Sequence, residues 1–507
     1  MSYQVTQEDL DILRQGMQEI TVKVDLLDTN YKILDSLEGN VITDSISQDN
    51  ESVQRRSYSC TLQITHSSFS IGKDKKIWYD KRIRPYYGVK SLRTGNIKYY
   101  LLGTFTYDSI NSQYDPVTNQ LQLTCPDLMS LYDGTLNGQI GGYGSSNPDS
   151  DAIAQGLFIP AGEDIRKSII ATLKASGITQ YIVEDIGKEI PYDLEFDTGT
   201  TFCDVWTKIR DLYDSWEFYF DINGVFIWQQ VPTCLDDPVV LDDDIMQQIT
   251  VDENVNVKLS GIYNVTEVFG KVLELTNNDR YAETSTYTDN VYHITLDGYK
   301  EWSDVNNLTK IGLKVLTDNL DSPKFSINNY SPIPIYDGDG KPLKAGVLKS
   351  NNSYVFRFRR QTVTESGLVM GLFLLGQYQC YGKYVESSPK CPYSTVNIGE
   401  IGKSVQYDSL TDDAACYNQA EYLTYKTTAM MDTINLTTQV IPWLEVNQKV
   451  SYKSKLSHEL NQYIVKSLNW TTGDGTMSLV LYKFLEDFSF VYDRKHKKKE
   501  GYLIYGF

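Results

Sequence analysis

Judged by residue type and spacing, the potentially reactive residues form neither a complete catalytic set nor a complete metal-binding set. Asp337 and Asp339 lie two residues apart in the run DGDG, as in calcium loops. An EF-hand loop also needs a glutamate at its twelfth position, and here that position is Leu348. We therefore interpret this run as a β-turn.

Other groups of potential ligands are equally incomplete. Asp242, Asp243 and Asp244 could bind a divalent cation, but adjacent acids in a linker are usually only solvated. The four histidines are far apart and none has a second histidine four residues further on, which argues against a zinc site. The seven cysteines include no C-x-x-C pair, so we expect reduced, partly buried thiols from a reducing compartment.

The common motifs of nucleophilic, metal-dependent and phosphate-binding enzymes are absent from the sequence. It contains no G-x-S-x-G, H-E-x-x-H or G-x-x-x-x-G-K-[ST], and no cysteine–histidine pairing stands out. A glycosidase needs two carboxylates a few ångströms apart, but with 66 acidic residues the sequence cannot single out such a pair. We predict that the chain is not an enzyme and uses no cofactor or metal.

Length and charge indicate an acidic protein of several domains. A chain of 507 residues favours two to four domains. A net charge of −19 disfavours a general nucleic-acid binder, which needs a cationic face. The N-terminus lacks the basic and apolar regions of a signal peptide, and the longest apolar run is too short to span a membrane. We expect a soluble protein made in the cytoplasm, without stable membrane insertion.

The elements that would position any site are mostly strands. We predict an α+β, mainly β, fold with two similar small β-barrels, an α+β insert between them and short helices. Residues 1–134 carry a short helix at 6–17, capped by Thr6, and then about six strands of the first barrel.

The second segment, 135–232, begins with a loop rich in Gly, Ser and Asn at 135–160 and continues as the α+β insert. Thr201 is expected to cap the second of its two helices. A hairpin closes the insert, and Asn223–Gly224 predicts a type I′ turn there.

The third segment, 233–484, is the predicted second barrel, with a large insertion over about 270–404. Within the insertion the pattern permits a helix near 307–319. The closing stretch, Thr411–Phe484, predicts a helix capped by Thr411, then a strand and a final hairpin.

The last segment, 485–507, is an aromatic and basic tail. It carries RKHKKK at 494–499 in a chain that is otherwise strongly acidic. The run could contact DNA, the acidic lumen of a neighbouring chain or a partner protein, or it could simply be solvated, and the flanking aromatic residues favour docking on a partner. The residues predicted to dock are Arg494, Lys495, Lys497, Lys498, Lys499 and Phe507.

The order of these segments resembles that of the hub proteins of bacteriophage tails and baseplates, including those of contractile phages and phage-tail-like particles. The resemblance is carried by IWYDKRIRPYY and YYLLGTFTYD early in the chain, and by IPWLEVNQKVSY, QYIVKSLNW and GTMSLVLYKF near its end. It covers residues 20–232 and 405–484 and leaves 270–400 unmatched.

The resemblance implies a homotrimer in the virion, assembled in the cytoplasm of the bacterial host. Two similar barrels in each chain would give a pseudo-six-fold ring. Such a hub joins the six-fold tail tube and the distal tail protein to a three-fold spike or tail-tip protein. Its channel passes the tape-measure protein and then DNA, without specific binding, and an acidic wall would reduce adhesion of DNA.

The alternative function belongs to a different class. It is a tail protein that binds or hydrolyses cell-wall glycans, using the 135–160 loop and exposed tyrosines. Turnover of glycan by the isolated chain would favour this alternative over the hub.

Overall fold

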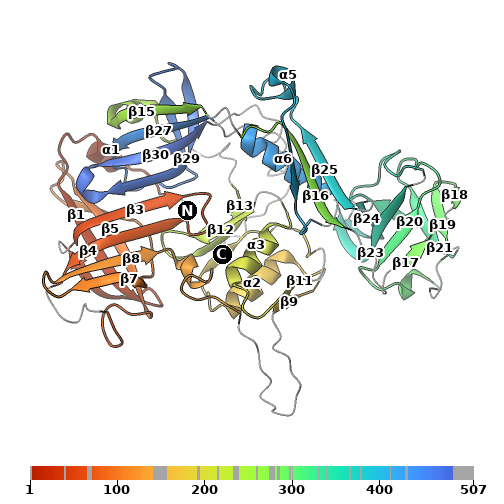
Figure 1. Ribbon diagram of the computed structural model, residues 1–507, viewed down its shortest axis with the longest axis horizontal. Coiled ribbons are helices and arrows are strands. Elements are labelled where there is room, and N and C mark those ends of the chain that lie inside the picture. Colours follow the sequence, from red (N-terminus) through yellow and green to blue (C-terminus); the bar gives the residue numbers. More distant parts are fainter. Residues whose placement is uncertain are drawn as a thin grey trace, which may run out of the picture.

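A computed structural model describes most of the chain. It is mainly β with short helices, which confirms the predicted α+β, mainly β, class, and it is elongated, with a large sheet at one end and a smaller β module at the other (Figure 1). The described residues are 3–38, 41–64, 71–140, 157–160, 162–185, 187–190, 194–213, 216–231, 239–257, 261–272, 280–282, 286–295, 299, 301–328, 330–338, 340–350, 352–364, 367–376, 379–410, 413–428 and 432–483.

The N-terminal segment supplies strands to two sheets. Four strands form a sheet of their own in the order β2-β1-β5-β6, and the others join the large sheet. The elements are α1 (Gln7–Leu13), β1 (Ile20–Asp28), β2 (Ile33–Glu38), β3 (Val41–Asp49), β4 (Arg56–Gln63), β5 (Lys81–Lys90), β6 (Ile97–Leu101), β7 (Asp108–Asp115) and β8 (Gln120–Pro126).

The large sheet runs through both strand-rich segments. Its main path is β15-β27-β30-β29-β3-β4-β8-β7, and its two halves meet where β29 pairs with β3, from Ser467–Asp49 to Thr471–Ser45. Blue and red strands therefore lie side by side in Figure 1. The C-terminal strands are β14 (Val239–Leu241), β15 (Thr250–Val257), β27 (Asp432–Gln439), β28 (Lys449–Lys453), β29 (Leu460–Thr471) and β30 (Thr476–Lys483).

The two halves of this path have the same topology. When the strands of each half are numbered by chain order, both halves follow the spatial order first, second, fourth, third. That order is β15-β27-β30-β29 in one half and β3-β4-β8-β7 in the other. Every neighbouring pair along the path is antiparallel. The path is therefore a tandem repeat of one four-stranded arrangement.

One hydrophobic core is shared by both halves. It contains Tyr87 and Leu123 from the N-terminal segment together with Leu436 and Leu479 from the C-terminal one, all at most 2% exposed. Burying one large apolar side chain contributes about 1.5–3 kcal/mol. Separating the halves would expose many such side chains, so we expect the two halves to fold as one unit.

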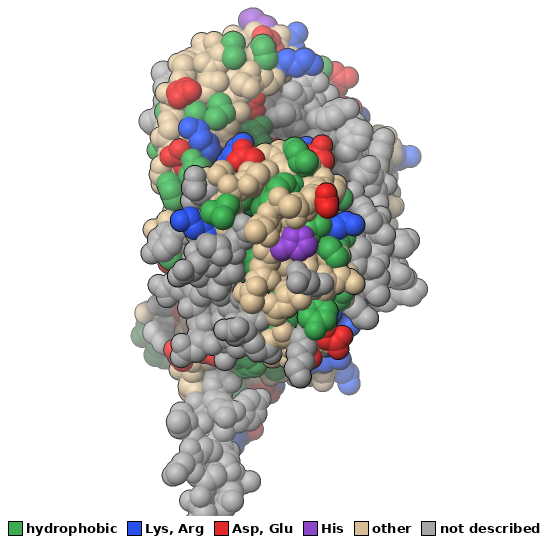
Figure 2. Space-filling model, turned by 90° about the vertical axis from the view of Figure 1, so that its right-hand side faces the viewer, with side chains coloured by type: hydrophobic (Ala, Val, Ile, Leu, Met, Phe, Trp, Pro, Cys, Tyr) green, Lys and Arg blue, Asp and Glu red, His purple; other side chains and the backbone are tan. Residues whose placement is uncertain are grey.

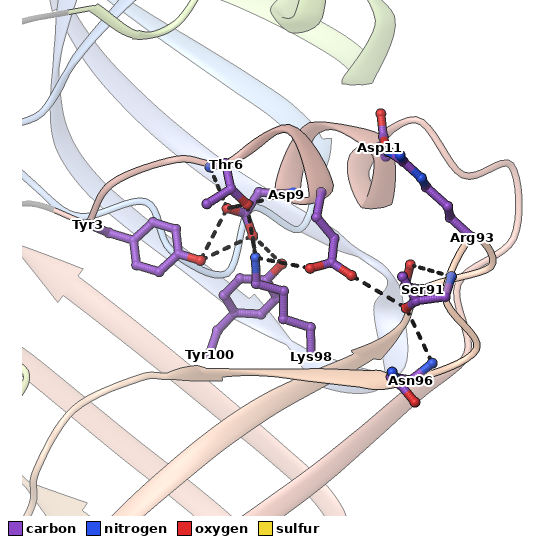
Figure 3. A network of polar contacts seen from close by, with 11 residues as sticks. Tyr3, Thr6, Asp9, Asp11, Ser91, Arg93, Asn96, Lys98 and Tyr100 are labelled. Carbon is purple, nitrogen blue, oxygen red and sulfur yellow. Dashed lines mark hydrogen bonds and ion pairs between the residues drawn. The ribbon is translucent and has the colours of Figure 1, made fainter.

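Helix α1 is anchored by a buried carboxylate, that of Asp9. Thr6 caps the helix, as predicted, and Asp9 accepts a bond from the Thr6 amide at 2.7 Å. Asp9 also accepts from Tyr100 Oη at 2.7 Å and pairs with Lys98 Nζ at 2.6 Å, both from β6 (Figure 3). Burial by itself would raise the pKa of Asp9, but the bonds from Lys98, Thr6 and Tyr100 together hold it below its ordinary value.

The α+β insert has its own core, and its hairpin turn differs from the prediction. Thr201 caps the second helix, as predicted. The predicted type I′ turn is wrong, because of Asn223 and Gly224 only Gly224 has positive φ (81°). The Asp221 carboxylate instead accepts bonds from the Asn223 and Val225 amides in a longer loop. The elements are β9 (Leu157–Ile159), α2 (Ile165–Ala175), β10 (Tyr181–Val183), β11 (Leu194–Phe196), α3 (Phe202–Arg210), β12 (Trp216–Phe220) and β13 (Phe226–Gln230).

The insertion in the third segment forms a three-stranded sheet, β25-β16-β26, and beyond it a distal module with an eight-stranded sheet. The helix expected near 307–319 is wrong. Lys310–Lys314 is strand β20, which pairs with the long strand β23 and buries Ile311 and Leu313. Tertiary pairing has overridden the local pattern.

The elements of this insertion are mostly short strands. They are β16 (Val265–Val272), β17 (Arg280–Ala282), β18 (Thr286–Thr288), β19 (Val291–Ile294), β20 (Lys310–Lys314), β21 (Lys324–Ile327), β22 (Ile333–Tyr336), β23 (Ser353–Thr364), β24 (Gly367–Gly376), β25 (Gln379–Val385), α5 (Thr395–Ile398) and β26 (Gly402–Gln406).

Helix α6 (Asp413–Thr428) packs across β16 and β25. Of its expected apolar face, Ala420 is buried, whereas Leu423 and Thr427 are half-buried. Thr411, expected to cap the helix, lies outside the described residues. The final hairpin is present as β29–β30, and the side chains predicted to be buried in it are buried: Ile464, Leu468, Met477, Leu479 and Leu481.

Candidate functional site

The acidic residues singled out from the sequence have local structural roles. Asp337 accepts a bond from the Lys341 amide at 2.8 Å, and Gly340 has a φ of 82°, so this run forms a turn, as predicted. Asp339 lies outside the described residues. The predicted docking residues of the C-terminal tail, from Arg494 to Phe507, also lie outside them.

The three adjacent acids belong to a helix start instead of a solvated linker. Asp242 caps α4 (Asp243–Ile249) by accepting from the Ile245 amide at 3.0 Å. Asp243 accepts from the Lys453 amide at 2.6 Å and so ties this helix to β28. Negative charge in the first turn also stabilises the helix.

Searches for metal and membrane sites are negative within the described ranges. There, no three His, Cys, Asp or Glu side chains are close enough together to hold a metal ion. No helix in the same ranges combines the length and hydropathy needed to cross a membrane.

The outward face of the large sheet has an unusual composition. In a chain whose residues are 22% charged, a continuous area across six strands of both halves carries hydroxyl and amide side chains, with Val480 beside Asn435 at its border. We call it the hydroxyl–amide face. Its residues are Thr43, Ser45, Ser47, Ser57, Ser59, Thr61, Gln122, Thr124, Asn435, Thr437, Gln439, Asn469, Thr471, Thr476 and Ser478.

Strand register places these residues in rows. Because side chains alternate between the two faces of a sheet, cross-strand partners point the same way. One row joins Ser478, Asn469, Ser47 and Ser57 across β30, β29, β3 and β4, and so passes through the junction of the halves. The face is therefore a product of the whole chain.

Hydroxyl groups on this face bond to each other. Ser45 Oγ lies 2.8 Å from Ser59 Oγ, and Ser47 Oγ lies 2.7 Å from Ser57 Oγ. Each pair bridges β3 and β4. A hydroxyl that already has a partner gains less by binding a ligand, because the existing bond must be exchanged.

The face is slightly hollowed at the junction. An open hollow of about 510 Å³ lies over β3, β4, β8 and β29, and its lining includes Ser47, Ser57 and Asn469. The aromatic side chains beneath it, Tyr58 and Trp470, are buried and point inward. The hollow thus offers short, uncharged groups without a ring on which a sugar could stack.

Next to the face, a buried polar junction ties three parts of the chain together. Arg55 Nη2 lies 2.6 Å from Glu217 Oε2 of the α+β insert, and its guanidinium stacks on Tyr219 at 3.6 Å. Arg56 Nη2 lies 2.6 Å from Glu445 Oε2 of the C-terminal segment. Arg56 also donates to the Phe220 carbonyl at 2.8 Å, so the two arginines fix the insert against both halves.

Asp127 lies buried close to this junction. Burial raises its pKa to about 6, although the Met129 amide bond and the charges of Arg56 and Arg55 oppose the shift. Its neighbours therefore only partly compensate its negative charge at neutral pH.

At the opposite end of the molecule, the described side chains form a surface of different composition. On the side formed by the distal module, Lys, Arg, Asp and Glu side chains are scattered among apolar ones (Figure 2). Within the described part of that side, no area is dominated by one sign of charge. A cationic surface for nucleic acid is not visible there.

Comparison with known proteins gives one partial family match. A family model described as a domain of unknown function, DUF5048, matches residues 390–488, which include α6 and the closing strands. No curated protein matches the sequence.

The solved structures to which the chain is similar include phage tail proteins. A tail protein from Neisseria meningitidis MC58 is 9% identical with a TM-score of 0.47, covering 93% of this chain and 98% of that one. A 43 kDa tail protein of prophage MuSo2 from Shewanella oneidensis is 8% identical with a TM-score of 0.46, covering 91% and 98%. A prophage tail protein from Listeria monocytogenes EGD-e is 9% identical with a TM-score of 0.44, covering 94% and 100%. At these scores, none of the three assigns a function to the chain.

Sequence patterns did not single out the hydroxyl–amide face or the polar junction. Each strand shows only ordinary alternation, such as Ser57, Ser59 and Thr61 between buried residues. What makes the face unusual is the pairing of β3 with β29, more than 400 positions apart in the chain. The sequence signal that could have pointed to the hydroxyl–amide face is the recurrence of uncharged polar residues at alternate positions of β3, β4, β29 and β30.

Proposed function

We propose that the chain is a structural component of a phage tail or phage-tail-like particle. In this role it acts as a homotrimeric hub without catalytic activity. It joins the six-fold tail tube and distal tail protein to a three-fold spike or tail-tip protein. The resemblance in sequence supports this class.

The tandem repeat in the large sheet is the observation that carries the proposal. A ring that meets a six-fold partner needs six similar surfaces, and closed rings of identical chains are the usual form of such assemblies. A chain that repeats one four-stranded arrangement twice supplies six such surfaces with three copies. The shared core keeps the two repeats of one chain at a fixed spacing.

The hydroxyl–amide face is the part of the chain proposed to line the channel. DNA binding requires cations that displace counterions from phosphate, and this face has none. The net charge predicts an acidic wall that repels DNA. The residues of this face are uncharged instead, so they would limit the adhesion of DNA by offering its phosphates no cation. A passing tape-measure protein would likewise meet no charged side chain among the residues of this face.

The C-terminal tail is proposed to dock on a partner protein of the particle. Its basic and aromatic residues, from Arg494 to Phe507, are the ones assigned to this contact. Deleting 486–507 should weaken assembly with that partner. Unchanged assembly of the truncated chain at raised salt would exclude the role.

The molar mass in solution tests the proposal. Light scattering of the purified chain should give three times the chain mass of 57.8 kDa, or, after addition of its tail partner, three chain masses plus that of the bound partner. A chain that stays monomeric at every concentration and with every partner contradicts the hub.

A further inference from the structure

We propose that Cys380 and Cys416 form a latent disulfide site that, once oxidised, ties helix α6 to strand β25. Both residues are thiols in the structure, and both side chains are 0% exposed. The inference rests on the proposed function in one respect: a tail particle leaves the reducing cytoplasm in which its chains are made, and disulfides persist in oxidising surroundings.

The two cysteines belong to elements at the base of the distal module. Strand β25 follows β24, which is part of the eight-stranded sheet of that module, whereas α6 leads into β27 of the large sheet. In Figure 1, α6 and β25 lie between the large sheet and the distal module. Both cysteines pack in one hydrophobic cluster with Val355 of β23 and Leu375 of β24. A bond between them would therefore join the base of the distal module to the helix that returns the chain to the large sheet.

Two close approaches hold the first turn of α6 on this end of β25. Asp413, the first residue of the helix, accepts a bond from the Tyr381 amide at 2.9 Å. One residue further along β25, a Cβ atom on Gly382 would lie 2.3 Å from the Cys416 carbonyl carbon. The backbones of helix and strand are thus in direct contact, so Cys416 is fixed over β25.

A glycine on the neighbouring strand lets the two cysteine side chains meet. Cys380 and Gly382 are two residues apart in β25, so both face α6. A Cβ atom on Gly270 of β16 would lie 2.7 Å from Cys416 Sγ and 2.8 Å from Cys380 Cβ. Both side chains therefore converge on the space that a larger residue at position 270 would fill.

A rotation at Cys380 completes the geometry. Its Sγ donates to the Leu375 carbonyl oxygen at 3.7 Å, and a thiol is a weak donor, so this bond is easily given up. Rotation about the Cα–Cβ bond of Cys380 is the movement that turns its sulfur toward Cys416. A disulfide requires Cβ atoms about 3.5–4.5 Å apart, which suits two side chains that meet at one point.

The reaction is thiol–disulfide exchange with a small disulfide such as oxidised glutathione. The Cys416 thiolate attacks one glutathione sulfur, which forms a mixed disulfide and releases one glutathione thiolate. The Cys380 thiolate then attacks the Cys416 sulfur and releases the second. Two protein thiols are oxidised, one glutathione disulfide is reduced, and the two protons pass to the released thiolates.

Burial makes this exchange depend on local opening of the helix. Cys416 lies in the first turn of α6, and helix ends open more readily than helix centres. The bond should therefore form slowly, and faster at a temperature at which the end of the helix opens more often.

Counting thiols in the unmodified chain tests the site. The reduced chain is incubated without denaturant in an excess of oxidised glutathione, then denatured and alkylated with iodoacetamide. We expect two of the seven cysteines to become protected, and peptide mapping to find Cys380 linked to Cys416. Dithiothreitol should restore all seven. Because the bond closes a loop through α5 and β26, it should raise the melting temperature by about 3 °C or more.

Two single variants provide a matched comparison. Cys416→Ala removes one partner of the bond, whereas Cys203→Ala makes the same change at another buried cysteine, in helix α3 of the α+β insert. After oxidation, Cys203→Ala should still protect two cysteines and gain thermal stability. Cys416→Ala should do neither.

The mapping of the unmodified chain decides the outcome even if a variant does not fold. Absence of the Cys380–Cys416 peptide after oxidation overturns the inference. So does a link between Cys60 and Cys125, on the neighbouring strands β4 and β8, in place of this bond. A glutathione adduct that stays on Cys416 without passing to Cys380 overturns it as well.

These outcomes are distinct from those that test the proposed function. The bond forms within one chain, so it can be measured on a monomer and on a trimer alike. A monomeric chain that forms the bond contradicts the hub and leaves the disulfide site standing. A trimeric chain that does not form it contradicts the disulfide site alone.

Discussion

Asp127 is a buried carboxylic acid beside two buried arginines, yet its pKa lies above its ordinary value. Burial raises this pKa from 3.8 to about 6. Since the folded value lies above the unfolded one, the group favours the folded state below its unfolded pKa. That contribution to the free energy of unfolding is lost as pH rises through about 6. The loss is about 3 kcal/mol at neutral pH.

Replacing Asp127 by asparagine removes this titration. The amide oxygen can still accept the bond from the Met129 amide, which lies 2.9 Å from Asp127 Oδ1. We expect Asp127→Asn to be more stable than the unmodified chain at pH 7.5, by up to about 3 kcal/mol, with the difference shrinking as pH falls from 6 to 4. Denaturant unfolding at several pH values measures it. A difference that is constant with pH would show that Asp127 does not titrate in this range.

Arg56 is the second residue on which the polar junction depends. It is 3% exposed and bonds to both Glu445 and the Phe220 carbonyl. Arg56→Ala leaves the half-buried Glu445 carboxylate and the Phe220 carbonyl without their donor, and we expect a loss of about 1–3 kcal/mol in the free energy of unfolding.

A surface pair provides the control for this change. Arg93 is bonded to Asp11 but its side chain is 71% exposed. Arg93→Ala should cost about 0–1 kcal/mol, because solvent screens such pairs. Equal losses for the two variants would mean that the junction does not stabilise the fold.

At the residue scale, the sequence predicted what depends on near neighbours. Thr6 and Thr201 cap their helices because each lies three residues before an aspartate that completes the capping box. The ion pairs of Arg55 and Arg56 join residues 162 and 389 positions apart, so no local pattern reveals them. The turn at Asn223 was wrong because the Asp221 carboxylate bonds two loop amides and so favours a longer loop.

At the scale of elements, β25 and α6 approach each other closely at Gly382. A Cβ atom on Gly382 would lie 2.1 Å from the Tyr417 backbone nitrogen, a distance that the structure cannot accept without moving the helix. Gly402 in β26 of the same sheet has open space at that position.

These two glycines form a matched pair. We expect Gly382→Ala to destabilise the packing of α6 by about 1–3 kcal/mol through overpacking. Gly402→Ala should have a much smaller effect. Thermal unfolding of both variants measures the difference, and a neutral Gly382→Ala would mean that α6 does not pack as closely as described.

Elements with a complete local pattern were predicted well, and those that depend on partners were not. The final hairpin was found because Ile464 and Leu468 alternate with polar residues and face Met477 and Leu479. Residues 307–319 suggested a helix, but β23 supplies a long neighbour that makes β20 a strand. Pairing with a distant strand is the information that a local pattern lacks.

For the whole molecule, the sequence indicated two similar strand-rich segments but not how they are joined. The sheet order shows them side by side, with one core beneath and one uncharged face above. This arrangement requires β3 and β29 to meet, which follows from the fold as a whole. The α+β insert and the distal module are attached outside this sheet (Figure 1).

The central claim is that three copies place six similar sheet halves around one channel. Electron microscopy of the purified assembly tests it most directly. We predict ring-shaped particles with a central channel, three-fold symmetry with an approximate six-fold inner wall, and the hydroxyl–amide face lining that wall. Particles without a channel, or a ring in which this face points outward, would contradict the account.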